Sequence, residues 1–267
     1  MQSLSEYKKI VVKVGTSTLT YENGKMNLKR IEQLVRVLSD LKNSGRDVVL
    51  VSSGAISVGV SKMGLAERPG DIPGKQAAAA VGQCALMHLY DNLFLEHGHH
   101  VGQVLLTRDA VEHGRKDFIV NTFNRLLSMG AIPVVNENDT LAIEEIEFGD
   151  NDSLSAVVAA LIGADILIIL SDIDGLYDSD PKVNPNAKLI KKVTSADTEI
   201  CAAAGPSRST HGTGGMVTKL SAARMMMEKG ITTAIVNGEN SSNISDILEG
   251  KSCGTLFLPN NIKEVII

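Results

Sequence analysis

The sequence predicts an α/β fold in which helices cover both faces of a mainly parallel central sheet. Short runs rich in Val, Ile and Leu alternate along the chain with longer amphipathic segments. Most of the short runs are apolar throughout, which is typical of parallel strands that are buried on both faces. Strands that alternate with helices in this way give a three-layer α/β/α sandwich.

Six segments are predicted as strands, each rich in β-branched residues and followed by residues that favour turns. They cover residues 9–15, 47–54, 101–107, 131–139, 166–172 and 232–238. Ligands of open α/β sheets bind beyond the carboxyl ends of the strands. We therefore expect the function of the chain to lie in the loops that follow these six segments.

Five longer segments, one between each pair of successive strands, are predicted as helices. In the first, Asn27 can cap the helix, aliphatic residues follow at helical spacing, and Gly45 can end it. The aliphatic stripe comprises Leu28, Ile31, Leu34, Val35, Leu38 and Leu41. The other four helices are expected at residues 74–98, 117–130, 152–164 and 217–230.

Composition and charge exclude several classes of protein. The 267 residues carry a net charge of −5 without a long basic run, which disfavours nucleic acid or an anionic membrane as a main partner. Cys84, Cys201 and Cys253 lie far apart, so we expect neither a disulfide framework nor a zinc site. No signal peptide or membrane span is recognisable, and we expect a cytoplasmic protein.

Small polar loops follow four of the predicted strands. They are residues 15–17 (Gly-Thr-Ser), 52–55 (Ser-Ser-Gly-Ala), 136–139 (Asn-Glu-Asn-Asp) and 171–175 (Ser-Asp-Ile-Asp-Gly), and residues 149–152 (Gly-Asp-Asn-Asp) precede a helix. Glycine lets a backbone approach a ligand closely, and free N–H groups at helix N-termini favour anions. Several such loops at one sheet edge indicate a phosphate-rich ligand.

A glycine-rich stretch, residues 211–220 (HGTGGMVTKL), precedes the last predicted helix. Its backbone N–H groups can surround phosphate oxygens, and Lys219 in the first helical turn can reach a phosphoryl group. The P-loop pattern and protein-kinase motifs are absent, and the Rossmann pattern fails at Val217. The sequence therefore requires a different kind of phosphate site.

Six motifs in a fixed order resemble the amino acid kinase family, from Lys9 to about Pro259. They are K-V-G-T-S, S-S-G-A-I, N-E-N-D, G-D-N-D-x-L-S-A, S-D-x-D-G-L-Y-x-x-D-P and G-T-G-G-M-x-T-K-L. The resemblance implies a sandwich fold and phosphoryl transfer from ATP, with Mg²⁺, to a small anionic acceptor. It is closest to members that phosphorylate the γ-carboxylate of L-glutamate, giving L-glutamyl 5-phosphate and ADP in the first step of proline biosynthesis.

The resemblance also implies a role for individual residues. Lys13 and Lys219 would flank the transferred phosphoryl group, and Asp152 would orient the two lysines or the metal. The implied glutamate site comprises Ser53, Gly54, Asp139 and Asn151. The implied ATP site comprises Lys13, Gly15, Thr16, Ser17, Ser171, Asp172, Thr213, Gly214, Gly215, Met216, Val217, Thr218 and Lys219. Mg²⁺ would be held mainly through the ATP phosphates, and its protein ligands stay unassigned.

We expect one domain over residues 1–267, with the acceptor bound by about 1–165 and the nucleotide by about 166–267. Many bacterial members carry a further C-terminal RNA-binding-like (PUA) domain, which we do not expect in a chain that ends at Ile267. The resemblance further implies a homodimer or homotetramer and feedback inhibition by proline.

The chemistry is consistent with a carboxylate acceptor. The side-chain carboxyl group of glutamate has a reference pKa of about 4.3, so at neutral pH it is already a nucleophile and needs no general base. Two lysines would offset its repulsion from the γ-phosphate. We expect Asp139 to pair with the α-ammonium group of the substrate, with Ser53 and Asn151 as hydrogen-bonding partners.

Simpler interpretations and other functions stay open. Lys13 can be an ordinary strand-end lysine, Asp139 a turn residue, and Asp152 is expected to cap its helix in any case. Residues 67–75 can be a lid, a regulatory loop or a surface connection. The chain can also be a family member acting on acetylglutamate, aspartate, carbamate or a nucleoside monophosphate, or a non-catalytic sensor of an amino acid or nucleotide.

Overall fold

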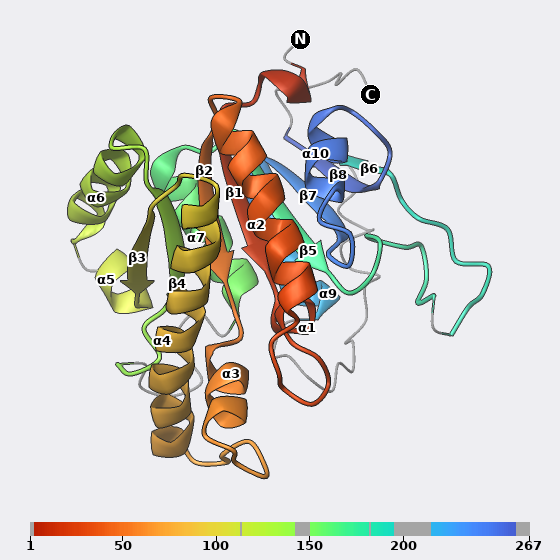
Figure 1. The fold of residues 1–267 in the computed structure, drawn as a ribbon. Helices are drawn as coiled ribbons and strands as arrows, with labels where there is room; N and C mark the ends of the chain where they lie inside the picture. The colour runs from red at the N-terminus through yellow and green to blue at the C-terminus, as the bar shows by residue number, and fades with distance from the viewer. Residues whose placement is uncertain (1–2, 113, 142–149, 182, 195–214, 260–267) are drawn as a thin grey trace.

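The computed structural model describes residues 3–112, 114–141, 150–181, 183–194 and 215–259 of the chain. Eight strands in this part form one sheet in the order β3-β4-β2-β1-β5-β7-β8-β6 (Figure 1). They are β1 (Lys9–Val14), β2 (Asp47–Ser52), β3 (Val101–Leu106), β4 (Ile132–Glu137), β5 (Ile166–Ser171), β6 (Lys192–Thr194), β7 (Thr232–Asn237) and β8 (Gly254–Leu258). Neighbouring strands are parallel except β7 and β8, which run antiparallel.

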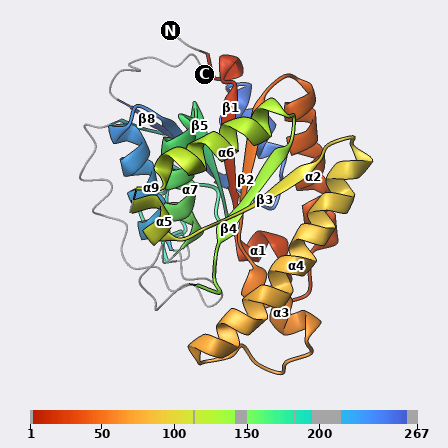
Figure 2. The same ribbon diagram turned by 90° about the vertical axis from the view of Figure 1, so that its left-hand side faces the viewer.

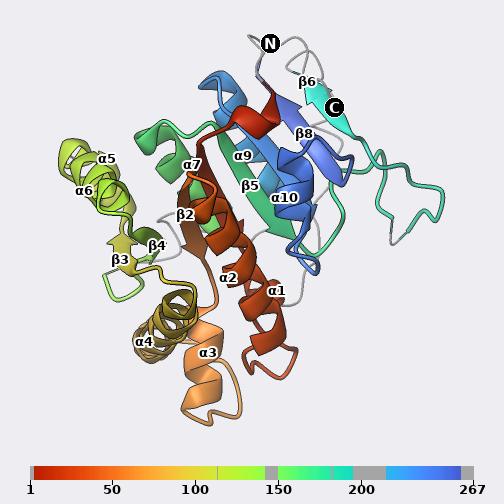
Figure 3. The same cartoon turned by 45° about the horizontal axis from the view of Figure 1, so that its top comes forward.

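Helices cover both faces of this sheet, which confirms the predicted fold class. The helices are η1 (Leu4–Glu6), α1 (Thr16–Leu19), α2 (Leu28–Asn43), α3 (Ala55–Lys62), α4 (Ile72–Glu96), α5 (Arg108–Glu112), α6 (Lys116–Ser128), α7 (Asn151–Ile162), α9 (Met216–Glu228) and α10 (Asn243–Leu248). Helices α2, α4 and α10 pack into one hydrophobic cluster, and α6, α7 and α9 pack into a second (Figure 3). The two clusters are the cores on either side of the sheet.

The central strands are apolar throughout because both of their faces are buried. Ile10 and Val12 of β1 belong to the cluster under α2, whereas Val11 between them belongs to the opposite cluster. Side chains of a strand alternate between its two faces, so a strand covered on both sides needs apolar residues at every position. The continuous apolar composition of these strands therefore follows from their place between two layers of helices.

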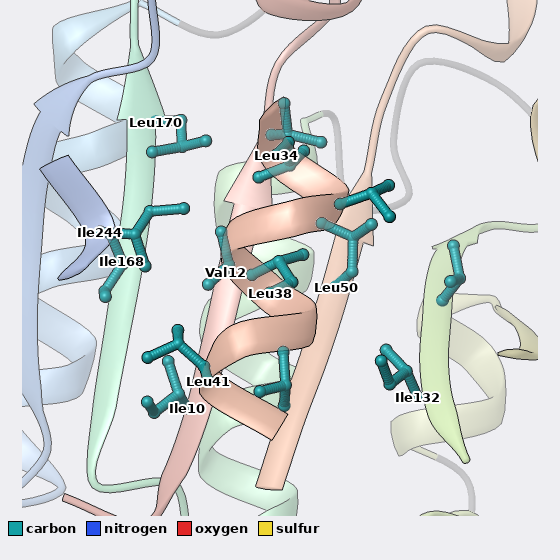
Figure 4. Close-up of a cluster of buried hydrophobic side chains, with 14 of the residues drawn as sticks. Ile10, Val12, Leu34, Leu38, Leu41, Leu50, Ile132, Ile168, Leu170 and Ile244 are labelled. Carbon is teal, nitrogen blue, oxygen red and sulfur yellow. The ribbon is translucent and has the colours of Figure 1, made fainter. Parts of the chain in front are cut away.

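Helix α2 shows how the local sequence sets an element. The Oδ1 atom of Asn27 accepts a hydrogen bond from the backbone N–H of Arg30 at 3.2 Å, as expected of an N-cap. Leu34, Leu38 and Leu41 of its buried face lie over β1 and its neighbours (Figure 4). Leu28 was wrongly placed in that stripe: as the first residue of α2 it is 49 % exposed and lies outside the cluster.

Two strands and five short helices of the described residues were not predicted from the sequence. The strands are β6 and β8, and the helices are η1, α1, α3, α5 and α10. Strand β6 has three residues and pairs only with β8, so neither its length nor its composition gives a periodic signal. The predicted helix at residues 74–98 begins slightly earlier, at Ile72, because Asp71 caps it.

Helices α3 and α4 pack unusually closely at the edge where the parallel strands end. A Cβ atom on Gly82 of α4 would lie 1.8 Å from the carbonyl oxygen of Ala55, and one on Gly59 of α3 would lie 1.8 Å from that of Ala78. Figures 1 and 2 show α3 and the beginning of α4 extending past the sheet at this edge. The contact fixes the start of α3, which follows directly from the carboxyl end of β2.

Candidate active site

Two lysines share one buried carboxylate at the carboxyl edge of the sheet. The Nζ atom of Lys13, near the end of β1, lies 2.6 Å from Oδ1 of Asp152, and Nζ of Lys219, in α9, lies 3.1 Å from Oδ2. The three residues are 6 %, 0 % and 7 % exposed, in the order Lys13, Asp152, Lys219. The structure therefore brings together the three residues predicted to be catalytic, and their roles in catalysis stay predictions.

The charges of this triad set the protonation of its members. Burial alone would raise the pKa of the Asp152 carboxyl, but Lys13, Lys219 and a hydrogen bond from Thr218 outweigh burial and hold that pKa below its ordinary value. Burial lowers the pKa of the Lys13 ammonium, with a further contribution from Lys219, although Asp152 opposes the shift. Two lysines and one aspartate give the triad a formal charge of +1 in a place that is shielded from solvent.

Helix α7 positions Asp152 through a cap at a neighbouring residue. The Oδ1 atom of Asp150 accepts a hydrogen bond from the backbone N–H of Ser153 at 2.9 Å, so Asp150 is the N-cap. The prediction that Asp152 caps this helix was wrong, because its carboxylate turns inward to the two lysines. Burial and the charge of Asp152 raise the pKa of the Asp150 carboxyl, although Ser153 and Lys13 oppose the shift.

Asn151 joins the ends of two strands beside the triad. Its Nδ2 atom lies 2.9 Å from the hydroxyl of Ser53, 3.0 Å from the carbonyl oxygen of Ser52 and 3.0 Å from Oδ1 of Asn136. Asn136 in turn donates through Nδ2 to Oε1 of Gln83 at 2.9 Å. The structure thus brings together two of the residues predicted to bind glutamate and connects them to α4.

The two other residues of the predicted glutamate site lie in loops of the same edge. Gly54 adopts φ 95°, a left-handed conformation that favours glycine, and begins α3. Asp139 lies in the turn after β4, where burial raises the pKa of its carboxyl group and the charge of Arg68 partly offsets this. Arg68 belongs to residues 67–75, so the part of this segment that precedes α4 lies near Asp139, which is predicted to bind the acceptor.

The predicted phosphate loop lies next to Lys13. A Cβ atom on Gly15 would lie 3.6 Å from Nζ of Lys13, and Gly15 is the N-cap of α1, which contains Thr16 and Ser17. Arg30 of α2 donates to the carbonyl oxygen of Ser17 at 3.3 Å. Its other terminal nitrogen lies 2.6 Å from Oε1 of Glu239, in the loop after β7. Arg30 therefore connects the predicted phosphate loop to the part of the chain that is predicted to bind the nucleotide.

The other residues of the predicted ATP site differ in how they are placed. Ser171 is buried at the end of β5 and donates to Asp172 at 3.3 Å, whereas Asp172 is exposed. Gly215 is the N-cap of α9, whose first turn holds Met216, the exposed Val217, and Thr218. Thr213 and Gly214 lie outside the described residues.

Sequence reasoning missed Gln83, Arg30 and Arg68 and gave no role to Asn136 and Asp150. The last two stand within the N-E-N-D and G-D-N-D motifs, so these motifs already carried the signal. Within the described ranges, no group of three or more His, Cys, Asp or Glu residues could hold a metal ion. No helix in the described part of the chain is both long and apolar enough to cross a bilayer.

A family model described as "Amino acid kinase family" matches residues 8–237. The chain belongs to the amino acid kinase family. This amino acid kinase is 57 % identical to the "Glutamate 5-kinase" of Clostridium perfringens over 262 residues, which cover 96 % of this chain and 97 % of that protein. It is 53 % identical to the "Glutamate 5-kinase" of Listeria welshimeri over 261 residues, 96 % of this chain and 95 % of the relative.

Two solved structures share the fold of this amino acid kinase. The UMP kinase from Ureaplasma parvum superposes with a TM-score of 0.66 at 18 % identity, over 97 % of this chain and all of the other. An isopentenyl phosphate kinase from T. acidophilum does so with a TM-score of 0.60 at 20 % identity, over 94 % of this chain and 100 % of the other. At such identities the likeness shows the fold alone.

Proposed function

We propose that this amino acid kinase transfers the γ-phosphoryl group of ATP to the γ-carboxylate of L-glutamate, which is glutamate 5-kinase activity. The names of its 57 % and 53 % identical relatives support this choice of acceptor. The structural observation that carries the proposal is the buried pair of lysines on Asp152. The product of the proposed reaction would be L-glutamyl 5-phosphate, and the reaction would be the first step of proline biosynthesis.

The triad suits a reaction between two anions. Two desolvated ammonium groups and one carboxylate, with a formal charge of +1 together, attract negative ligands strongly because little water screens them. A carboxylate oxygen attacks the γ-phosphorus as the bond to the β-phosphate oxygen breaks and ADP leaves. Lys13 and Lys219 would neutralise the charge on the transferred group, while Asp152 would hold both side chains in place.

Two sets of residues would hold the reactants on either side of the triad. On one side, the residues implied for ATP include the Gly15–Ser17 loop and the N-terminus of α9, and backbone N–H groups at such places favour phosphate. Mg²⁺ bound to the ATP phosphates would neutralise charge between the β and γ oxygens. On the other side, Asn151 and Ser53 offer hydrogen bonds, and Asp139 would pair with the α-ammonium group of glutamate.

The test is ADP release from MgATP with a panel of acceptors: L-glutamate, N-acetylglutamate, aspartate, carbamate and UMP. Hydroxylamine added to the reaction converts an acyl phosphate to a hydroxamate, which is measured directly. We expect hydroxamate with glutamate alone. Turnover with another acceptor instead would move the chain to that activity, and binding without turnover would identify a sensor. Oligomeric state, inhibition by proline and cytoplasmic location stay predictions.

A further inference from the structure

The hydroxyl group of Thr218 has two possible acceptors, and one of them belongs to the predicted catalytic residue Asp152. Thr218 lies in the first turn of α9, with Oγ1 2.8 Å from Oδ2 of Asp152 and 2.9 Å from the carbonyl oxygen of Gly215. A threonine hydroxyl carries one proton, so it donates to one of the two at a time. A bond to Gly215 is local to the helix, whereas a bond to Asp152 joins α9 to α7.

The contact with Asp152 adds a second hydrogen bond to one oxygen of a buried carboxylate. Oδ1 faces Lys13 at 2.6 Å, while Oδ2 receives both Lys219 at 3.1 Å and the hydroxyl of Thr218. Asp152 is fully buried, so water does not compete for these lone pairs. The hydroxyl of Thr218 makes the shorter of the two contacts to Oδ2, at 2.8 Å against 3.1 Å for Lys219, and so helps to fix the direction of that oxygen.

We propose that Thr218 is a positioning residue for phosphoryl transfer, whose hydroxyl orients the Asp152 carboxylate so that each of its oxygens faces one lysine. The inference deepens the proposed function and rests on it. It also gives the Thr218 hydroxyl a role different from the nucleotide contact that family resemblance implies. A lysine displaced from the transfer site stabilises the transition state less, so loss of the hydroxyl lowers turnover and leaves reactant binding nearly unchanged.

Two substitutions separate the hydroxyl from the rest of the side chain. Thr218→Val keeps the shape and removes the donor, and Thr218→Ser keeps the donor. A hydrogen bond to a charged group is worth enough that its loss lowers kcat about 10- to 100-fold in Thr218→Val. We expect KM for ATP and for glutamate to stay close to wild type, and Thr218→Ser to restore most of kcat.

Thr122→Val is the matched control. Thr122 also donates to a carbonyl oxygen of its own helix, that of Phe118 at 2.9 Å, but it lies on α6 away from the triad. Its substitution should leave kcat and both KM values unchanged. Thermal unfolding of all variants shows whether they are folded, and Thr218→Ala provides a second hydroxyl-free variant if Thr218→Val is not.

The Asp152→Asn background provides the decisive comparison. If Thr218 acts through Asp152, Thr218→Val should cost much less turnover in Asp152→Asn than in the wild type. An equal loss in both backgrounds would overturn the proposal. So would a normal kcat in a folded hydroxyl-free variant, or a raised KM for ATP with normal kcat, which would indicate a nucleotide contact.

Failure of this inference is distinguishable from failure of the proposed function. The wild-type protein reports on the acceptor, since hydroxamate forms with glutamate or does not. If another acceptor of the panel is phosphorylated, the Thr218 comparison is made with that acceptor. If the wild type phosphorylates none of them, both proposals are wrong.

Discussion

Lys13 and Asp152 form a buried ion pair with 2.6 Å between Nζ and Oδ1, although one ends a central strand and the other begins a helix far along the chain. Removing one partner of a buried ion pair destabilises a protein by about 3–5 kcal/mol, so each of these side chains contributes to keeping the other buried. The pair leaves Oδ2 of Asp152 for Lys219. This division of one carboxylate between two ammonium groups makes the effect of each lysine separately testable.

Lys13→Met and Lys219→Met should each lower kcat by about 10²–10³-fold, the usual cost of removing one group that stabilises transition-state charge. Methionine keeps much of the length of the side chain and removes the charge. Initial rates of hydroxamate formation at saturating ATP and glutamate measure the effect. Lys251→Met is the control, because Lys251 forms exposed ion pairs with Asp246 and Glu249 and should not affect turnover. A mutant with near-normal kcat would remove that lysine from the mechanism.

The sequence predicted these lysines because each stands in a motif at the end of a strand or the start of a helix. Parallel strands end at one edge, so residues that follow different strands meet in space. Asn151 contacts Ser52 and Asn136 at the ends of β2 and β4, and the next residue, Asp152, pairs with Lys13. Short apolar runs also sufficed to predict six of the strands, and the longer segments between them sufficed for five helices. These signals did not suffice for β6, whose three residues depend on pairing with β8.

Asp139→Asn should raise KM for glutamate about 10- to 100-fold, the cost of a lost charge-assisted hydrogen bond, and leave KM for ATP nearly unchanged. Wild-type KM for glutamate should also depend on pH. Burial raises the pKa of the Asp139 carboxyl, so the group becomes neutral at a higher pH than an exposed aspartate and then cannot pair with an ammonium group.

The pH dependence separates this role from a structural one. KM for glutamate should rise in the wild type as pH falls through the raised pKa of Asp139, and the same plot should be flatter for Asp139→Asn. The charge of Arg68 opposes the shift in the pKa of Asp139. In Arg68→Met, KM for glutamate should therefore begin to rise at a higher pH than in the wild type. An unchanged glutamate KM in Asp139→Asn would defeat the assignment.

Gly82→Ala should destabilise the protein and weaken glutamate binding together. The added Cβ would lie 1.8 Å from the carbonyl oxygen of Ala55 and 2.6 Å from the backbone nitrogen of Gly59, so α3 and α4 must separate. Overpacking of this kind costs about 1–3 kcal/mol and should lower Tm by several degrees. The next residue, Gln83, holds Asn136, so the shift should also raise KM for glutamate.

Gly70→Ala is the matched control for this prediction. Gly70 lies in the connection between α3 and α4, and nothing lies within 4 Å of a Cβ placed there. Scanning calorimetry should show a normal Tm for Gly70→Ala and a lower one for Gly82→Ala. Equal Tm values would mean that the close approach of the two helices is not needed for stability.

Gln83 and Arg30 show where inference from the sequence ends. Both stand on helices whose pattern is explained by packing alone, and their function depends on which residue faces them across the fold. Gln83 reaches Asn136, and Arg30 reaches Ser17 and Glu239, each through a tertiary contact that leaves no local signal. The cap of α7 was predicted at Asp152 and lies at Asp150 for a related reason. Both residue types suit a cap, and only the tertiary contact of Asp152 with the lysines distinguishes them.

Arg30→Met should raise KM for ATP by a few fold at most and leave kcat and KM for glutamate close to wild type. Arg30 connects the carbonyl oxygen of Ser17, in the predicted phosphate loop, to Glu239 after β7, and its loss would loosen that loop. Exposed ion pairs contribute only about 0.2–1 kcal/mol, which limits the effect. Glu239→Gln should have a smaller effect, because Arg30 keeps its bond to Ser17.

Arg224→Met is the control for Arg30→Met, since Arg224 forms a comparable exposed pair with Glu228 on α9. If Arg30→Met and Arg224→Met give the same KM for ATP, Arg30 does not position the phosphate loop.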